Sequence, residues 1–350
     1  MGRISAMWLK AREGQEEIVE QTEYPLVDLI RFICALMVVA IHIPPLSSYT
    51  GMAFANYLNY GIVHCLARVA VPYFFATSGF FLFQKIDLQD FNGSVVRKPL
   101  VKNLRLYATW MILLIAGGTY HLWYMKGIVV AIVFISVMLK KGVKLKHLFY
   151  MSIFLYVIGL LGDSYHGLLQ NVESTSVVGY IISAYEHFFS NTRNGMFMGV
   201  PFMFIGALLA KKRIDIKAPV AMLGLFLSVI ALIGEAFIIH RFGLAKDHNM
   251  YISLLPAVFF LLYIALHLQI KSYSFYKTLR ITGIIIFFSH LFVHSILKGC
   301  FLLASIVWGR SINNSLAGYF LTIVFAALLG FAIEKLSKNP RFSYLKWLYS

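Results

Sequence analysis

The sequence predicts an all-α, polytopic integral membrane protein with about ten transmembrane helices. Of its 350 residues, 59% are hydrophobic, and the mean hydropathy is +0.75. Charged residues make up only 13% of the chain, whereas a soluble domain carries about 25%. Apolar runs recur from Tyr24 almost to the C-terminus, and no polar stretch between them is long enough for a soluble domain.

The expected helices are separated by short polar or basic segments. We expect them over residues 24–43, 61–83, 104–118, 121–139, 147–161, 194–210, 218–240, 250–267, 281–303 and 316–333, with a short interfacial helix over 177–189. The segment 104–118 is short of the roughly 20 residues that a crossing needs. Gly199 and Gly206 predict close packing of the sixth helix. The chain then divides into an N-terminal tail, 1–23, a transmembrane domain, 24–336, and a basic tail, 337–350.

The positive charge follows the pattern of a membrane protein. The formal net charge is +16, and most lysines and arginines lie in the tails and in the segments 84–105, 140–146, 211–217 and 271–280. Cytoplasmic loops of membrane proteins carry such an excess. We therefore expect a multi-pass protein of the cell membrane with both termini in the cytoplasm, and no nucleic-acid partner.

The first expected helix contains three ionisable residues, Asp28, Arg31 and His42. At 100° per residue, Arg31 and His42 fall nearly on one face, about 16 Å apart along the axis, and Asp28 lies close to that face. Ionisable groups in a membrane helix usually face a protein interior or a wet cavity. A histidine suits a general base, and an arginine suits phosphate or carboxylate. Snorkelling of Asp28 and Arg31, and a place for His42 at the outer interface, are the alternatives.

Several other polar residues lie in or beside apolar runs. Arg193 could bind an anion or snorkel, His121 could belong to an aromatic belt or to a substrate site, and Ser78 could make a polar contact or lie at a tight packing site. His290 and His294 are four residues apart and share a helical face. Without a neighbouring carboxylate they favour packing or a polar cavity over a metal site. Cys34, Cys65 and Cys300 have no metal-ligand spacing, so we expect neither a metal nor a bound cofactor.

Six segments together resemble the acyltransferase-3 family of integral membrane acyltransferases over nearly the whole chain. They are DLIRFICALMVVAIH at 28–42, VPYFFATSGFFLF at 71–83, RKPLVKNLRLYATW at 97–110, HLWY at 121–124, RNGMFMGVPFMFIGALLAKK at 193–212 and FFSHLFVHSIL at 287–297. The most specific feature is an arginine and a histidine separated by ten residues. RVAVPYFF and RNGMFMGVPF are most similar to the membrane half of VanT-type serine racemases, a bacterial group, without the soluble racemase half.

The resemblance implies transfer of an acyl group, often acetyl, from cytoplasmic acyl-CoA to a hydroxyl of an envelope glycan or related acceptor. It implies His42 as the catalytic base, and Arg31, Arg97 and Arg105 as residues that hold or guide the CoA phosphates. Asp28, Ser78, His121, Arg193 and His290 are then candidates for the acceptor side or the cavity. Only ten residues separate Trp110 from His121, fewer than the resemblance leads us to expect.

Two alternatives stay open. The likeness to VanT-type proteins allows a transporter that moves a small polar solute such as serine along the same polar face. The short connection between Trp110 and His121 allows a membrane-embedded interaction partner that has lost catalysis.

Overall fold

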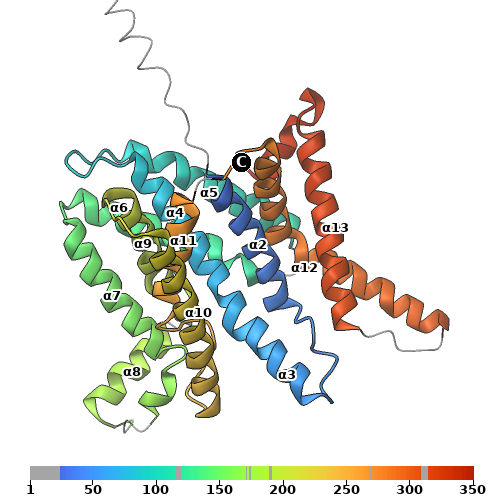
Figure 1. Ribbon diagram of the computed structural model, residues 1–350, viewed down its shortest axis with the longest axis horizontal. Coiled ribbons are helices and arrows are strands. Elements are labelled where there is room, and N and C mark those ends of the chain that lie inside the picture. Colours follow the sequence, from blue (N-terminus) through green and yellow to red (C-terminus); the bar gives the residue numbers. More distant parts are fainter. Residues whose placement is uncertain are drawn as a thin grey trace, which may run out of the picture.

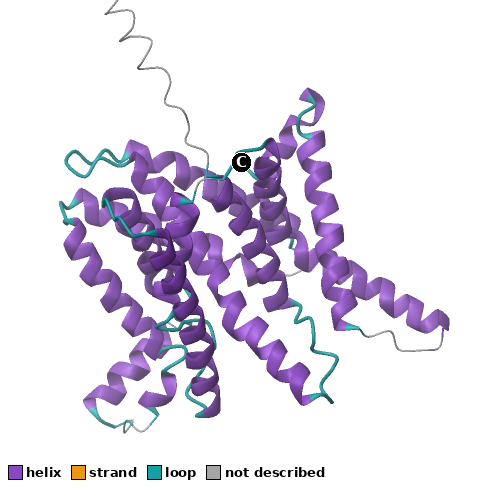
Figure 2. Ribbon diagram, viewed as in Figure 1, coloured by secondary structure: helices purple, strands orange, loops and turns teal. Residues whose placement is uncertain are grey.

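The computed structural model describes residues 24–115, 120–170, 172, 175–188, 191–268, 270–308 and 314–350. The N-terminal tail expected over 1–23 lies outside these residues, as does the connection 116–119. Every regular element in the described part of the chain is a helix, as Figure 2 shows. The predicted all-α class is confirmed.

The α-helices are long and are joined by short loops (Figure 1). They are α2 (Pro25–His42), α3 (Ala53–Tyr60), α4 (Ala70–Lys85), α5 (Ser94–Leu113), α6 (Trp123–Lys140), α7 (Leu145–Leu161), α8 (Val177–Phe188), α9 (Val200–Lys211), α10 (Ala218–Arg241), α11 (Leu254–His267), α12 (Ser274–Trp308) and α13 (Ser315–Leu336). Shorter helical turns lie between them: η1 (Gly61–Cys65), η2 (Leu66–Val69), η3 (Tyr120–Leu122), η4 (His166–Leu169), η5 (Gly195–Gly199) and η6 (Pro340–Leu348).

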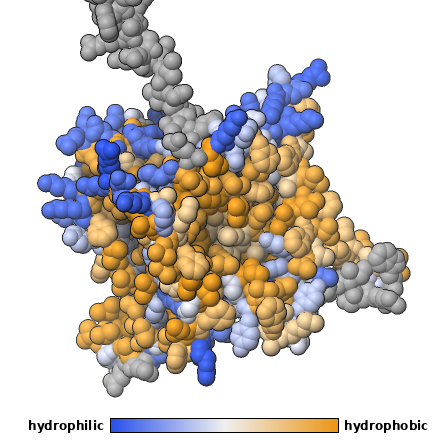
Figure 3. All heavy atoms as spheres, in the orientation of Figure 1, coloured by the Kyte–Doolittle hydropathy of each residue, from blue (hydrophilic) through white to orange (hydrophobic). Residues whose placement is uncertain are grey.

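In the part of the chain that the structure describes, six helical stretches are long and apolar enough to cross a membrane: Pro25–His42, Ala53–Lys85, Trp123–Lys140, Ala218–Arg241, Ser274–Val307 and Ser315–Leu336. Shorter apolar helices cover Leu145–Leu161, Gly195–Lys211 and Leu254–His267. Figure 3 shows a broad hydrophobic surface across the bundle, with hydrophilic residues gathered at its upper end. The chain is a multi-pass membrane protein, and the number of ten crossings stays a prediction.

One end of the bundle is rich in basic residues, and we call it the basic end. The start of α2 and the C-terminus lie there (Figure 1), together with the end of α4 at Lys85 and the end of α9 at Lys211. Lys211 donates a hydrogen bond to the carbonyl of Ile86, 2.5 Å away, and so ties these two helix ends together. The opposite end holds the loop after α2 and the end of α10.

Two predicted helix boundaries are wrong. The segment 104–118 was expected to form a helix by itself, but α5 begins at Ser94 and includes the basic residues 97–105. The eighth expected helix begins at Leu254 instead of residue 250. The backbone amides just before α11 are bound by an acidic side chain. The carboxylate of Glu235 accepts hydrogen bonds from the backbone N–H groups of Ile252 and Ser253, at 2.6 and 2.8 Å. Those residues therefore form a turn.

Other expected helices differ mainly in length. The ninth, expected over 281–303, is the longer α12, whose last turns extend beyond the bundle in Figure 1. The helix expected over 177–189 is present as α8, and residue 189 lies outside the described part. Its place at the membrane interface stays a prediction. The basic tail is not extended, because η6 packs back against α5: the indole N–H of Trp110 donates to the carbonyl of Leu348 at 3.0 Å.

Glycines allow α4 and α9 to pack backbone against backbone. A Cβ added at Gly206 would lie 2.0 Å from the carbonyl oxygen of Ala76, and one at Gly79 would lie 2.1 Å from that of Met203. The close packing predicted for Gly206 is therefore confirmed. This contact holds α4, and with it the residues that line the large cavity described below, against the rest of the bundle.

Candidate functional site

Three histidines from distant parts of the sequence meet beside the C-terminal end of α2. The ring of His42, the last residue of α2, stacks on that of His290 from α12, with 5.3 Å between centroids and 27° between planes. The ring of His121 from η3 lies 6.3 Å from His42 and 5.1 Å from His290. Three residues singled out independently in the sequence thus form one cluster.

Backbone carbonyls of α12 fix the orientation of the two supporting histidines. His290, which is fully buried, donates from Nδ1 towards the carbonyls of Phe287 and Ile286, at 2.8 and 3.0 Å. His121, 1% exposed, donates from Nε2 to the carbonyl of Phe288 at 3.1 Å. A histidine held in this way keeps one tautomer. His42, which is half-buried, and His121 both line a small pocket that also contains other polar groups.

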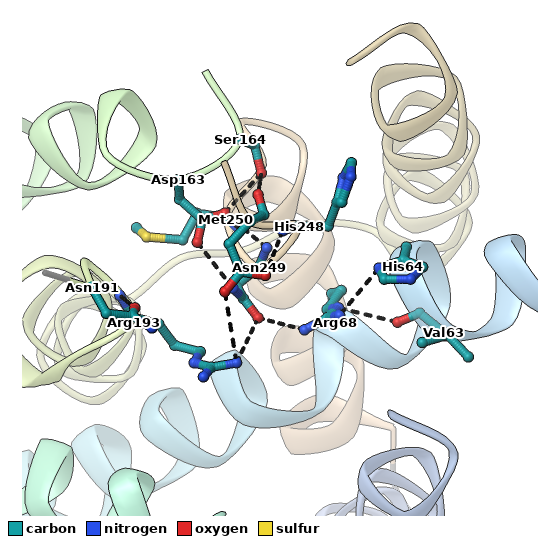
Figure 4. A network of polar contacts seen from close by, with 11 residues as sticks. Val63, His64, Arg68, Asp163, Ser164, Asn191, Arg193, His248, Asn249 and Met250 are labelled. Carbon is teal, nitrogen blue, oxygen red and sulfur yellow. Dashed lines mark hydrogen bonds and ion pairs between the residues drawn. The ribbon is translucent and has the colours of Figure 1, made fainter. Parts of the chain in front are cut away.

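His42 shares this pocket with two arginines, Arg68 and Arg193, and with Asn249. Figure 4 shows the two guanidinium groups approaching Asn249 from different sides. Both donate to the same oxygen, Asn249 Oδ1, Arg193 through Nη1 at 3.1 Å. We call this the histidine pocket; its volume is about 30 Å³, which is the space of about one water molecule.

Other groups hold each arginine in place. Arg68 also donates from Nε to the carbonyl of Val63 at 3.1 Å and from Nη2 to His64 Nδ1 at 3.2 Å. Arg193 lies over the ring of Trp123, 5.2 Å from its centroid, and a carboxylate oxygen of Asp247 is 4.0 Å from its Nη1.

A buried carboxylate, Asp163, holds Asn249 in position. Its Oδ1 accepts from the backbone N–H groups of Asn249 and Met250, at 2.8 and 3.0 Å, and its Oδ2 accepts from the Asn249 side chain at 3.0 Å. Ser164 donates to the same carboxylate at 2.9 Å. Burial raises the pKa of Asp163, and the hydrogen bonds from Asn249 oppose that shift. Burial, with the nearby charge of Arg68, also lowers the pKa of His248, which precedes Asn249.

Irregular helical turns position both arginines. Arg68 lies in η2, a 3₁₀ turn that follows the π-helical turn η1, and Arg193 lies just before the π-helical turn η5. Asn194 caps η5 by accepting from the N–H groups of Met196 and Phe197. π-helical turns are rare and frequently occur at functional sites. In a membrane protein, irregular backbone is tolerated where it is buried in protein or lines a cavity.

A second, much larger cavity opens towards the basic end. Its volume is about 690 Å³, within the size range of small-molecule and cofactor sites. Five basic side chains line it, from four different helices: Arg31, Lys85, Lys98, Lys102 and Arg280. We call it the large cavity. Its inner wall is aromatic and includes Phe74, Tyr124 and Phe287.

An aromatic partition separates the two cavities. Tyr124 and Phe287 line both of them. Their rings meet edge to face with 5.6 Å between centroids, and Phe74 packs on each of them at 5.9 Å. A molecule bound in the large cavity is therefore one layer of side chains away from His42.

The two conspicuous charged residues of α2 face the large cavity or its mouth. Arg31 lines the cavity itself. Asp28 accepts a hydrogen bond from Arg280 Nη1, with 3.1 Å between Asp28 Oδ2 and that nitrogen, and the pair links α2 to α12. Asp28 thus lies beside the cationic mouth of the large cavity, far along the helix from His42.

The remaining candidates have different surroundings. Ser78 lines the large cavity. Arg97 is exposed, and neither it nor Arg105 is among the residues that line the cavity. Arg105 donates to the backbone carbonyl of Ser350 and lies over the ring of Trp347. His294 faces α13 instead of His42, with its Nδ1 3.2 Å from Thr322 Oγ1.

Sequence reasoning missed several residues of the two cavities. Lys98 and Lys102 are four residues apart on α5, a spacing that places them on one face. Asn249, Tyr124 and Phe287 carry no sequence signal, because their role depends on which elements pack beside them. Among the described residues, no group of three or more His, Cys, Asp or Glu side chains is arranged to hold a metal ion.

The chain is similar to known proteins over most of its length. Residues 24–118 match the family described as an acyltransferase domain. An amino-acid racemase of Enterococcus faecalis is 28% identical over 290 residues, covering 75% of this chain and 39% of the relative. A serine/alanine racemase of Enterococcus gallinarum is 31% identical over 265 residues, covering 67% of this chain and 36% of the relative.

A second amino-acid racemase of Enterococcus faecalis is 27% identical over 353 residues, covering 91% of this chain and 47% of the relative. The chain thus spans less than half the length of the curated relatives it matches. No solved structure matches it. The match over residues 24–118 includes Arg31 and His42. Through this segment the chain resembles the acyltransferase-3 family, and over most of its length it is similar to bacterial proteins named as racemases.

Proposed function

We propose that the chain is a membrane-bound O-acyltransferase. It moves an acyl group, acetyl in the simplest case, from cytoplasmic acyl-CoA to a hydroxyl of an envelope glycan or related acceptor. The observation that carries the proposal is that one helix, α2, contributes Arg31 to the large cavity and His42 to the histidine pocket, and that the two spaces share an aromatic wall.

The large cavity suits the donor. Acyl-CoA carries several phosphates at one end and a thioester at the other, joined by a long flexible arm. The five basic side chains supply positive charge at the mouth, where arginine in particular can bind phosphate with two parallel hydrogen bonds. The aromatic inner wall suits the less polar arm and directs the thioester towards Tyr124 and Phe287.

The basic end then faces the cytoplasm, in agreement with the excess of lysine and arginine expected there. The donor enters from that side of the cell membrane, and the acceptor reaches His42 from the opposite side. Both termini are cytoplasmic in this arrangement.

In the proposed reaction His42 is the general base. The side chains of Tyr124 and Phe287 move aside so that the thioester reaches the histidine pocket. There His42 takes the proton of the acceptor hydroxyl as that oxygen attacks the thioester carbonyl carbon. The carbon–sulfur bond breaks, the new ester forms, and the CoA sulfur leaves as a thiolate that takes up the proton from His42. Arg68 and Arg193 line this pocket and supply positive charge that stabilises negative charge developing in the transition state.

A second candidate function is a transporter of a small amino acid such as serine. The curated relatives are named as racemases, and two spaces that lie on either side of an aromatic partition also resemble the two halves of a transport path. This reading needs no acyl-CoA.

Acetyl-CoA binding to purified protein separates these functions. Wild type is compared with Arg31→Ala and His42→Ala. We expect saturable binding that is lost in Arg31→Ala and kept in His42→Ala, while only His42→Ala loses acyl transfer to hydroxyl acceptors. Absence of binding in all three proteins, together with uptake of labelled serine into vesicles without acyl-CoA, would favour the transporter. Absence of both would favour an inactive interaction partner.

A further inference from the structure

We propose that Arg68 and Arg193 form an anion subsite, so that the acceptor is a hydroxyl compound with a carboxylate or a phosphate beside the reacting hydroxyl. The inference rests on the proposed function in one respect, namely that the bound compound is the acceptor of acyl transfer. Binding of an anion at the site does not depend on acyl transfer. It starts from the way in which the two guanidinium groups share one neutral oxygen.

The two positive charges converge without a carboxylate between them. Both donate to Asn249 Oδ1, which is an amide oxygen and carries no charge. Within the described part of the chain, Arg68 forms no ion pair. Arg193 has Asp247 at 4.0 Å, and the Asp247 side chain is 42% exposed. Two guanidinium groups held close together in a membrane protein are costly unless an anion offsets their charge.

The nearest buried carboxylate does not fill this role. Asp163 accepts four hydrogen bonds, from the backbone N–H groups of Asn249 and Met250, from the Asn249 side chain and from Ser164. It therefore reaches the arginines only through Asn249. The effect of Asp163 is to fix the Asn249 oxygen, which in turn aligns the two guanidinium groups.

Donors remain for a ligand. A guanidinium has five N–H groups. Among the residues that the structure describes, Arg193 contacts Asn249 and Asp247 through Nη1, and its Nε and Nη2 have no hydrogen-bond partner. Both arginines line the histidine pocket together with His42. An acidic group bound there would place a neighbouring hydroxyl next to the His42 ring.

The size of the pocket limits what enters it. A volume of about 30 Å³ accepts one small group, about the size of a water molecule, and excludes a whole sugar. The reacting hydroxyl therefore enters the pocket, and the acidic group must lie within one or two bonds of it to meet the arginines that line the same pocket.

Three small probes share one carbon skeleton and differ in charge: glycerol, glycerate and glycerol 3-phosphate. Binding of each labelled probe to the purified chain is measured by scintillation proximity at pH 7, without acyl-CoA. We expect at least one acid to bind about tenfold or more tightly than glycerol, as expected for charge-assisted hydrogen bonds. Whichever of glycerate and glycerol 3-phosphate binds more tightly shows whether the subsite takes a carboxylate or a phosphate.

Variants connect the preference to the two arginines. Arg68→Gln and Arg193→Gln should each bind the acids no better than glycerol. Arg241→Gln is the matched control, because Arg241 is an exposed cation at the end of α10 that lines neither cavity, and it should keep the preference. Arg193→Lys keeps the charge but loses the planar fork, so we expect acid binding about tenfold weaker than in wild type. This variant also serves if the glutamine variants do not fold.

The proposal is overturned if no probe binds, if all three bind alike, if the preference survives in both glutamine variants, or if Arg193→Lys binds the acid as wild type does. Failure of the acyltransferase proposal looks different: the acids still bind, but no acetylated product forms when acetyl-CoA is added.

Discussion

The imidazole rings of His42 and His290 stack with 5.3 Å between their centroids, although 247 positions of the chain separate them. The contact places the proposed base of α2 against a fully buried ring of α12. His290 is oriented by two backbone carbonyls, so it presents a fixed surface to His42. The position of the proposed base therefore depends on the packing of α12 against α2.

Replacement of His290 should slow acyl transfer without weakening the binding of acetyl-CoA. His290→Phe keeps a ring against His42 but removes the polar atoms beside a group that gains a proton in the proposed reaction. We expect about a tenfold lower rate of acyl transfer, within the range by which proton-transfer groups contribute to catalysis, and unchanged acetyl-CoA affinity. His294→Phe is the matched control, because His294 faces Thr322 on α13. Equal losses in both variants would contradict a specific role for His290.

Donor affinity should depend on the residues that line the large cavity. Arg31→Gln and the double variant Lys98→Gln/Lys102→Gln should each weaken acetyl-CoA binding by about tenfold or more, since a charge-assisted hydrogen bond contributes about 1.5–3 kcal/mol. Arg97→Gln should have a smaller effect, because Arg97 is exposed and does not line the cavity. Isothermal titration would measure the three affinities. A larger loss in Arg97→Gln than in Arg31→Gln would place the phosphates outside the cavity.

The aromatic partition should keep water away from the thioester. Phe287→Ala would connect the large cavity to the histidine pocket and let water reach the proposed base. We expect hydrolysis of acetyl-CoA to rise severalfold relative to transfer, measured as free CoA against acetylated product. Phe288→Ala is the control, since Phe288 lines only the large cavity. A similar hydrolysis ratio in the two variants would show that Phe287 is not the barrier.

The contact between α4 and α9 should tolerate no side chain at Gly206. A Cβ there would lie 2.0 Å from the Ala76 carbonyl oxygen and 2.4 Å from the Phe80 nitrogen, so that a backbone must move. Overpacking of this kind costs about 1–3 kcal/mol, and we expect Gly206→Ala to lower the melting temperature in detergent by several degrees. Gly234→Ala on α10 meets nothing within 4 Å and should be neutral or slightly stabilising. Equal melting temperatures for both variants would argue against the close contact.

Much of the fold is readable from local sequence. Hydropathy alone predicts α2, α6, α10 and α13 to within a few residues at most ends, because a membrane helix satisfies its own backbone and needs a long apolar run. One of the two wrong boundaries lies where a distant side chain intervenes. α11 begins late because Glu235, on another helix, binds the amides of Ile252 and Ser253.

The candidate site is only partly readable in the same way. Arg31 and His42 stand out because charged groups in an apolar helix are costly and therefore conspicuous. The same reasoning points to His121, Arg193 and His290, but it does not show that all three lie around His42. That requires contacts between α2, η3 and α12.

The sequence by itself determined that this chain is helical, lies in a membrane and carries an arginine and a histidine on one face of its first apolar helix. Those properties depend on composition and on the period of a helix, which are local. Only the tertiary structure decided that Asn249 joins Arg68 to Arg193, that Arg105 binds the C-terminal segment, and that Tyr124 and Phe287 divide two cavities. Each of these depends on packing between distant segments, which no local pattern in the sequence records.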